Sequence, residues 1–225
     1  ASYSDQSNSG KRGEICLSLE GTGAEAYYTG DYTFDSLATQ SPSNLKSSLH
    51  HLMTSSHKKL TSYADCRDYV FRVDCEQNDT THATTLYTSY HMTSADWSPA
   101  WACNREHVWP QSLGGNNTNG GGADLHHIRP AEAGVNSSRG NKLYGESKGF
   151  YEPLDNVKGD VARIILYVYV RWDADWGATD VTKVFESVDI LLDWCELDPV
   201  DTWEMGRNEV VQSIQGNRNA FIDYP

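Results

Sequence analysis

The residues best suited to chemistry lie in the central segment of this 225-residue chain. Glu106 directly precedes His107, and Arg129 and Asn136 follow further along. A neutral imidazole accepts a proton near neutral pH, and carboxylate and amide oxygens are ligands that suit Mg²⁺ better than Zn²⁺. Hydrolysis of a phosphodiester requires a base, a cation and usually an arginine beside the phosphate. The central segment therefore predicts metal-assisted hydrolysis of a phosphodiester.

The central segment has the pattern of two strands and a helix. An apolar run at residues 101–103 leads into a strand that stops at Pro110, and a loop rich in Gly and Asn follows at residues 112–122. A second strand is predicted at residues 123–129 and a helix at residues 132–143. The predicted order over about residues 100–145 is strand, loop, strand, helix.

Helices are predicted on both sides of this segment. Ser41 and Pro42 suit a helix start, and apolar residues follow them at helical spacing. Residues 161–168 show the buried face of another helix. A third is predicted at residues 185–195, and a fourth runs from a cap at Asp198 toward residue 215.

The remaining segments complete the predicted fold. Residues 69–73 and 84–88 are rich in β-branched and aromatic side chains and predict strands or extended segments. Residues 1–31, rich in Ser and Gly, are interpreted as an irregular arm, and residues 217–223 as a tail folded back on the core. The sequence thus predicts a single mixed α+β domain over residues 32–225.

The net charge of −13 argues at first against a nucleic-acid partner, since phosphate affinity comes mainly from Lys and Arg. The acidic residues are concentrated at the end of the chain, where residues 172–225 carry 12 acidic and 3 basic side chains. The central third is close to neutral. This distribution is compatible with weak, salt-sensitive binding of DNA.

The five cysteines include no CxxC pair, which disfavours a zinc or thioredoxin-like motif. Up to two disulfides are expected, with Cys66 and Cys75 closing the shortest loop. No apolar run is long enough to span a membrane. We expect a secreted chain, extracellular or periplasmic, from which a signal peptide has been removed.

Three ordered motifs resemble the bacterial endonuclease I family of secreted and periplasmic nucleases, which belongs to the ββα-metal, or His-Me finger, nucleases. They are Glu-His-Val-Trp-Pro at 106–110, Asp-Leu-His-His-Ile-Arg-Pro at 124–130 and Gly-Val-Asn-Ser-Ser-Arg-Gly-Asn at 134–141. The ending at residues 216–225 is similar to the family's C-terminal tail. The resemblance covers the chain from about residue 40 to its end.

The resemblance implies an α+β fold with a ββα-metal core at about residues 100–145. It implies that His107 is the general base and that Glu106 and Asn136 hold one divalent ion, Mg²⁺ with Mn²⁺ or Ca²⁺ as alternatives. The implied function is sequence-nonspecific endonuclease cleavage of DNA, and also of RNA, leaving 5′-phosphates. Contacts limited to phosphate and sugar carry no base information. We expect a monomer without membrane association.

One departure concerns the arginine that stabilises the phosphate. Some family members carry it in a longer insertion between the two strands, whereas the loop here has no basic residue. Arg129 is therefore predicted to replace it, with Arg139 behind it. His127, Trp109 and Asn141 are further candidates for substrate contact or support of the site.

Each assignment has a structural alternative. Asn136 could cap a helix, and Glu106 could merely orient an arginine. Neighbouring residues of a strand face opposite sides, so only one of His126 and His127 can point at the site, and either could serve a structural role.

Two rival functions remain open at this point. One is a zinc hydrolase or zinc-stabilised module that uses Cys103, His107, His126 and His127. The other is a catalytically inactive secreted module that binds polyanions or a partner protein. The intact Glu106, His107 and Asn136 argue against the second rival.

Overall fold

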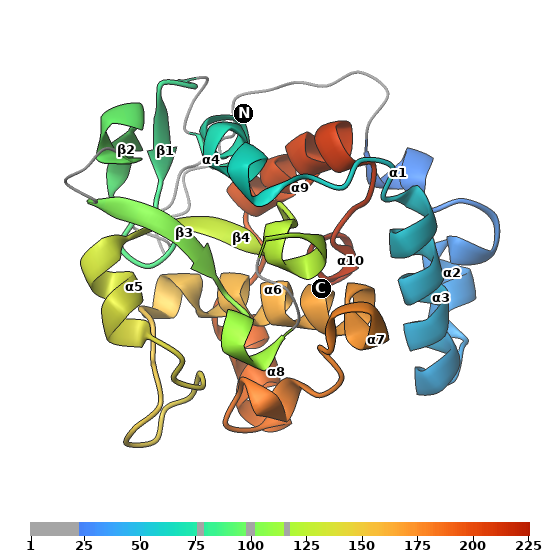
Figure 1. Ribbon diagram of the computed structural model, residues 1–225. Helices are drawn as coiled ribbons and strands as arrows, with labels where there is room; N and C mark the ends of the chain where they lie inside the picture. Colours follow the sequence, from blue (N-terminus) through green and yellow to red (C-terminus); the bar gives the residue numbers. More distant parts are fainter. Residues whose placement is uncertain (1–22, 76–78, 98–101, 115–117) are drawn as a thin grey trace.

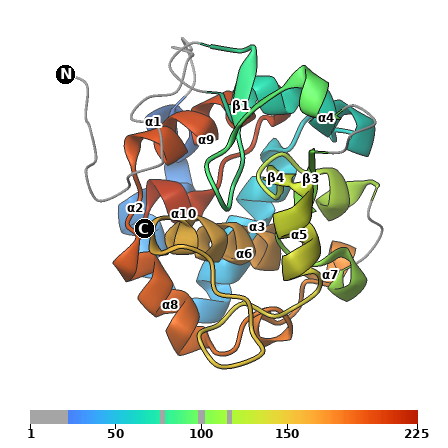
Figure 2. The ribbon, with the colours of Figure 1, turned by 90° about the vertical axis from the view of Figure 1, so that its left-hand side faces the viewer.

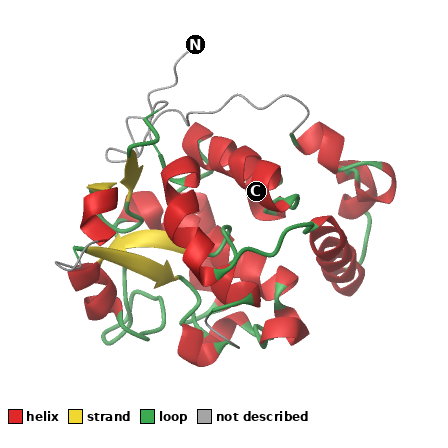
Figure 3. Ribbon diagram, turned by 45° about the horizontal axis from the view of Figure 1, so that its top comes forward, coloured by secondary structure: helices red, strands yellow, loops and turns green. Residues whose placement is uncertain are grey.

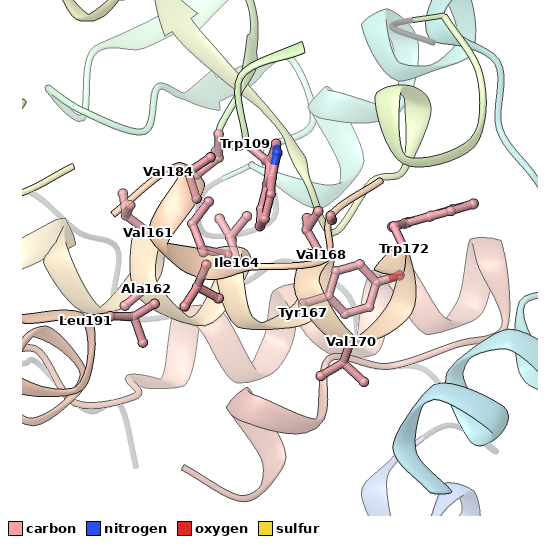
Figure 4. Packing of buried hydrophobic residues seen from close by; sticks show 14 of the residues in the cluster. Trp109, Val161, Ala162, Ile164, Tyr167, Val168, Val170, Trp172, Val184 and Leu191 are labelled. Atoms are coloured by element: carbon pink, nitrogen blue, oxygen red, sulfur yellow. The ribbon is translucent and has the colours of Figure 1, made fainter. Parts of the chain in front are cut away.

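The computed structural model describes residues 23–75, 79–97, 102–114 and 118–225. At its centre lies α6, Lys158–Arg171, with α3, α8 and α10 packed against it (Figure 1). The predicted helix is confirmed, but its buried surface is wider than one stripe. Ala162, Tyr167 and Val170 are buried as well as Val161 and Ile165, because neighbouring elements cover the helix on nearly every side (Figure 4).

The central segment, at about residues 100–145, forms a two-stranded antiparallel sheet followed by a helix. Strand β3, Cys103–His107, pairs with β4, Ile128–Glu132, so that Glu106 lies opposite Arg129 and His107 opposite Ile128. Helix α5, Ala133–Arg139, begins directly after β4 and packs beside both strands (Figure 2). The predicted order is confirmed.

The second strand begins later than predicted, because residues 124–127 form a turn instead. The carbonyl of Asp124 accepts from the backbone N–H groups of His127 and Ile128. Pro130 lies inside β4 rather than after it. It has no N–H to contribute, but its carbonyl accepts from Leu86 at 2.8 Å, so the proline is accommodated in a two-stranded sheet.

The predicted strand at residues 69–73 is wrong, because this segment belongs to helix α4, Tyr63–Val73. Ser62 and Asp65 form a capping box at its start, and Cys66, Val70 and Val73 share its buried face. The β-branched and aromatic content was outweighed by this cap and by the helical spacing. The predicted strand at residues 84–88 is largely wrong too. Strand β1, His82–Thr84, ends where that segment begins and pairs with β2, His91–Thr93.

The flanking helices make up most of the rest of the fold, and the small sheets lie toward one side of it (Figure 3). Their bounds are α1 Ala24–Tyr27, α2 Phe34–Ala38, α3 Pro42–Ser56, α7 Asp173–Trp176, α8 Val188–Leu197, α9 Thr202–Gln215 and α10 Ala220–Asp223. Short 3₁₀ turns lie at Gly30–Tyr32, Ser94–Trp97, Gln111–Leu113, Gly120–Ala123, Asp155–Val157 and Val181–Lys183. This is the mixed α+β class that was predicted.

Two helix caps can be compared with their predictions. The Ser41 side chain accepts from the backbone of Asn44, as expected for the start of α3. Helix α9 is capped by Asp201 rather than Asp198, because the Asp198 carboxylate accepts from the backbone N–H of Gly159 at the start of α6.

Both ends of the described chain pack on the domain. The predicted arm lies outside the described residues up to position 22, and from position 23 onward the chain is already part of the fold. Tyr28 is buried and donates to Asp223 at 2.8 Å. The tail is folded back as predicted, with Arg218 paired to Asp223 and the Asn219 backbone donating to Asn208.

The predicted Cys66–Cys75 disulfide is wrong. Cys66, Cys103 and Cys195 carry free thiols, and the Cys66 thiol lies 3.1 Å from the carbonyl of Ala123. Burial raises the pKa of the Cys66 and Cys103 thiols to about 12, so both are unreactive in the fold. Among the described residues, no helix has the length and apolar character needed to span a bilayer.

Candidate active site

A polar cavity of about 240 Å³ opens where the end of β3 meets α4 and α5. It brings together five of the residues singled out by the sequence: Glu106, His107, Asn136, Arg139 and Asn141. The other lining residues also carry polar groups or lie in the adjoining turns: Tyr63, Asn104, Arg105, Pro110, Gln111 and Gly140. The proximity that the motifs predicted is therefore present.

His107 is the last residue of β3 and is only 8% exposed. Its Nε2 lies 3.1 Å from the carbonyl oxygen of Gly122, in the turn before β4. A carbonyl can only accept, so Nε2 carries the hydrogen and Nδ1 holds the lone pair of the neutral ring. The ring stacks on Tyr63 at 5.4 Å between centroids, which fixes its orientation.

Glu106 points into the same cavity from the preceding position of β3 and is 2% exposed. Its Oε1 accepts from the Tyr87 hydroxyl at 2.6 Å and lies 3.2 Å from Nη1 of Arg139. Burial raises the pKa of the Glu106 carboxyl, and the opposing effects of Arg139, Tyr87 and the His107 backbone N–H leave a net rise. The carboxylate is thus held in place by neighbours, yet it lacks full compensation for its charge.

Asn136 faces the cavity from α5. Its Nδ2 donates to Oδ1 of Asn104 at 2.7 Å, which aligns the side chain with β3. The Oδ1 atom of Asn136 has no hydrogen-bond partner in the described part of the chain. Asn141 lines the same cavity, and Gly140, which follows the last residue of α5, has a φ of +57° that turns the chain there.

Arg139 contributes to the site through the backbone and Glu106. Its guanidinium donates to the carbonyls of His107 at 3.1 Å and Val108 at 2.6 Å, and its side chain is 1% exposed. These contacts hold the end of β3 against α5. They also occupy the guanidinium, so Arg139 positions Glu106 and His107 rather than presenting a charge to a ligand.

Two predicted site residues lie elsewhere. Arg129 is 2% exposed and places Nε 2.6 Å from Asp74, with its guanidinium over the Trp203 ring. Trp109 is fully buried, and its Nε1 donates to the carbonyl of Leu113. Neither lines the cavity. Direct contact of either side chain with a substrate is therefore not supported, because long-range packing has buried both.

His126 and His127 are buried and bonded to backbone groups, and the His127 ring meets the His107 ring edge-on at 5.7 Å between centroids. Nε2 of His127 accepts from the Trp109 backbone N–H at 2.9 Å, so its Nδ1 donates to the carbonyl of Gly121 at 2.6 Å. His126 makes a contact of 3.0 Å with the carbonyl of Asn217. Burial lowers the pKa of each imidazole to about 3. Both rings are therefore neutral near pH 7, and each is hydrogen-bonded to backbone groups of a different segment.

The positions of Cys103, His126 and His127 also disfavour a zinc hydrolase or a zinc-stabilised module. Cys103 lies in a separate hydrophobic cluster, and the two buried histidines bond to backbone groups. Within the described ranges, no three His, Cys, Asp or Glu side chains are grouped so that they could hold a metal ion.

Arg105 was not among the residues proposed from the sequence, yet it lines the cavity. Its guanidinium lies 3.6 Å above the Tyr63 ring, and Nη1 donates to the Tyr63 carbonyl at 2.5 Å. The signal was available, because residues two apart on a strand share a face, and Arg105 and His107 have that spacing. Asn104 and Glu106 form the corresponding pair.

Comparison with known proteins identifies the family of this chain. The Endonuclease I family profile matches residues 33–151 and 147–225. The chain belongs to the endonuclease I family. An extracellular ribonuclease of Bacillus subtilis (strain 168) is 33% identical over 100% of this chain and 89% of its own length. One from Bacillus amyloliquefaciens is 36% identical over 80% of this chain and 71% of its own. A periplasmic deoxyribonuclease of Aeromonas hydrophila is 30% identical over 44% of this chain and 47% of its own.

Membership of the endonuclease I family confirms the predicted resemblance and the prediction of a hydrolytic nuclease. The matched residues include every residue that lines the cavity. The family thus supplies the reaction class, and the cavity holds a histidine, a glutamate, an asparagine and arginines within one small space.

Proposed function

We propose that this protein is a sequence-nonspecific endonuclease that hydrolyses phosphodiester bonds of DNA and RNA at the cavity around His107. The observation that carries the proposal is the meeting of His107, Glu106, Asn136 and Arg105 in one polar cavity. Water attacks phosphorus, the bond between phosphorus and the 3′ oxygen breaks, and the product carries a 5′-phosphate.

His107 is the proposed general base. With the hydrogen on Nε2 held by the Gly122 carbonyl, the lone pair of Nδ1 takes a proton from the attacking water. The Tyr63 ring keeps the imidazole from rotating out of this orientation. Because the Gly122 carbonyl also favours an N–H on Nε2 after proton transfer, the imidazolium is stabilised as it forms.

Glu106 and Asn136 would hold one divalent metal ion, and their surroundings fit this role. The Asn136 amide has its NH₂ group committed to Asn104, which leaves its oxygen available as a ligand. Burial disfavours the charge of Glu106, and a cation beside it would offset that cost. Oxygen ligands favour Mg²⁺, with Mn²⁺ or Ca²⁺ as alternatives. When bound, such an ion stabilises negative charge on the phosphate and leaving oxygen.

Arg105 replaces Arg129 as the proposed phosphate ligand. Its guanidinium lines the cavity on the same strand face as His107, and stacking on Tyr63 orders it in advance. Arg129 has its charge committed to Asp74 instead. Arg139 supports the site from behind by holding Glu106 and the carbonyl of His107.

The relatives bear on substrate and location. Those that match most of this chain are named extracellular ribonucleases, and shorter matches are named deoxyribonucleases, both periplasmic and extracellular. We therefore propose that both nucleic acids are substrates and that the protein acts as a secreted monomer. Contacts limited to phosphate and sugar carry no base information, which agrees with cleavage that is not sequence-specific.

The proposal is tested by following supercoiled plasmid and single-stranded RNA in Mg²⁺, Mn²⁺ and Ca²⁺, each with and without chelator. The native chain is expected to nick and linearise the plasmid and to degrade the RNA. His107→Ala should abolish both activities. The matched control is His51→Ala, which removes an exposed histidine of α3 outside the cavity and should leave cleavage unchanged.

The results of these assays distinguish a nuclease from a binding module and test His107 as the base. If the native chain cleaves neither nucleic acid with any of the three ions, the nuclease proposal is wrong and a binding module becomes the better reading. If His107→Ala cleaves as fast as the native chain, another residue is the base.

A further inference from the structure

A second groove adjoins the active-site cavity. It has a volume of about 580 Å³, and its lining residues come from α4, β3 and the turn that ends at Trp97. Arg105 lines both spaces, and Tyr63, which lines the cavity, belongs to the same helix as Arg67 and Phe71 of the groove. The groove is therefore a continuation of the active site along α4.

The groove is lined by two arginines that are not paired with a carboxylate in the described part of the chain. Of the nine arginines in the described part of the chain, six are paired with a carboxylate: 129, 139, 163, 171, 207 and 218. The other three, Arg67, Arg72 and Arg105, form no such pair there, and Arg67 and Arg105 line the groove. Among the described residues that line it, Asp68 is the one acidic side chain. In a chain with a net charge of −13, two uncommitted guanidinium groups at one groove indicate an anionic ligand.

The walls of the groove are aromatic as well as cationic. Arg67 lies over the Trp97 ring at 6.0 Å and donates to the Trp97 carbonyl at 3.4 Å, which steadies an otherwise exposed side chain. Phe71 meets Trp97 edge-on at 6.5 Å and is only half-buried. A small inorganic anion would bind the arginine but make no favourable contact with the aromatic rings. A nucleotide can place its phosphate against the arginine and its sugar or base against a ring.

The spacing along α4 suits a chain of phosphates. Tyr63, Arg67 and Phe71 are four residues apart in turn, so they share one face of the helix, with a rise of about 6 Å for each step. The first lies at the His107 ring, and the other two lie in the groove. One helix face thus leads away from the proposed base.

We propose that this groove binds the nucleic-acid strand next to the phosphate being cleaved, with Arg67 contacting a flanking phosphate and Phe71 contacting its nucleoside. The inference rests on the proposed nuclease function, which it extends to a substrate longer than one phosphodiester. Arg67 acts in binding and takes no part in the proton transfers at His107.

The test compares Arg67→Ala with Arg72→Ala, a matched control on the same helix. Arg72 is exposed and forms no ion pair among the described residues, and it lines neither the cavity nor the groove. Both variants change the net charge equally. Steady-state cleavage of a labelled 20-nucleotide DNA duplex and of an RNA strand gives kcat and KM at several salt concentrations. Binding of the same duplex is measured by anisotropy with each change placed in the His107→Ala background.

Arg67→Ala is expected to raise KM and weaken binding on the order of five-fold at low salt, with kcat unchanged. The slope of log affinity against log salt should fall by about one, the effect of one lost phosphate contact. Arg67→Lys should retain most of the affinity, and Arg72→Ala should behave like the native chain.

The proposal is overturned if Arg67→Ala and Arg72→Ala give the same KM, the same binding and the same salt slope. If the native chain cleaves neither substrate, the nuclease function itself fails. These two failures are distinct, because the first leaves His107-dependent cleavage intact.

Discussion

Acidification should destabilise this fold through His126 and His127, whose imidazoles are buried and have pKa values near 3. In the unfolded chain each ring titrates near its ordinary value of 6.5. The unfolded state therefore binds protons below that pH while the native state does not, and stability falls as the pH drops from about 6.5 toward 3. The loss is about 1.4 kcal/mol per pH unit and per histidine, so each contributes about 2 kcal/mol at pH 5.

His127→Gln isolates one of these contributions. The glutamine side-chain oxygen can accept from the Trp109 backbone N–H as Nε2 of the imidazole does, but the side chain does not titrate. Loss of the donor to Gly121 costs about 1 kcal/mol at every pH. Urea unfolding at pH 7.5 and pH 5.0 gives the free energy of unfolding at each pH, and its decrease should be about 2 kcal/mol smaller in the variant.

The comparison contains its own control. Between pH 7.5 and 8.5 His127 is neutral in both the folded and the unfolded chain. The free energy of unfolding should therefore change with pH in the same way in the native protein and in the variant. Equal losses of stability on going from pH 7.5 to pH 5.0 would refute the reasoning, because His127 would then not be held neutral by the fold.

Three further changes have defined outcomes. Asp124→Asn keeps an acceptor at only one of the two carboxylate oxygen positions, so two of the four buried donors that bond to Asp124 lose their acceptor, and the free energy of unfolding should fall by about 2–6 kcal/mol in urea titrations; no loss would contradict that hydrogen-bond network. Gly216→Ala places a Cβ 2.4 Å from the Ser56 carbonyl at a φ of +95°, so its melting temperature should fall further than that of Gly149→Ala, where φ is also positive but no atom is near; equal shifts would count against the contact. Asn136→Ala should lower kcat/KM at least about tenfold and raise the Mg²⁺ concentration needed for half-maximal cleavage, whereas Asn136→Asp keeps an oxygen ligand and more activity; an unchanged Mg²⁺ requirement would exclude Asn136 as a ligand.

The sequence by itself located the cavity through local features. Glu106 and His107 are adjacent on one strand, and Asn136 lies on the helix that follows the next strand, so the order of the elements was enough to predict that they meet. The helices α3 and α6 were recognisable because caps and 3.6-residue spacing are properties of neighbouring residues. Such features survive in any tertiary context.

Segment 69–73 shows where local reasoning fails. Its β-branched and aromatic residues favour a strand, but burial of one face against α9 and the sheet region, together with the cap at Ser62, makes it part of α4. Since α4 also carries Tyr63 and Arg67, the error concealed both the partner of the His107 ring and the adjoining groove.

The tertiary structure alone decided which side chains remain available to a ligand. The sequence predicted Arg129 as the phosphate ligand, but Asp74, distant in the chain, pairs with Arg129, whereas Arg105 stacks on Tyr63 and lies at the cavity. His127 is likewise committed to backbone groups. Partners of this kind come from segments far apart in sequence, and the free energy of burying a charge or a polar group depends on them.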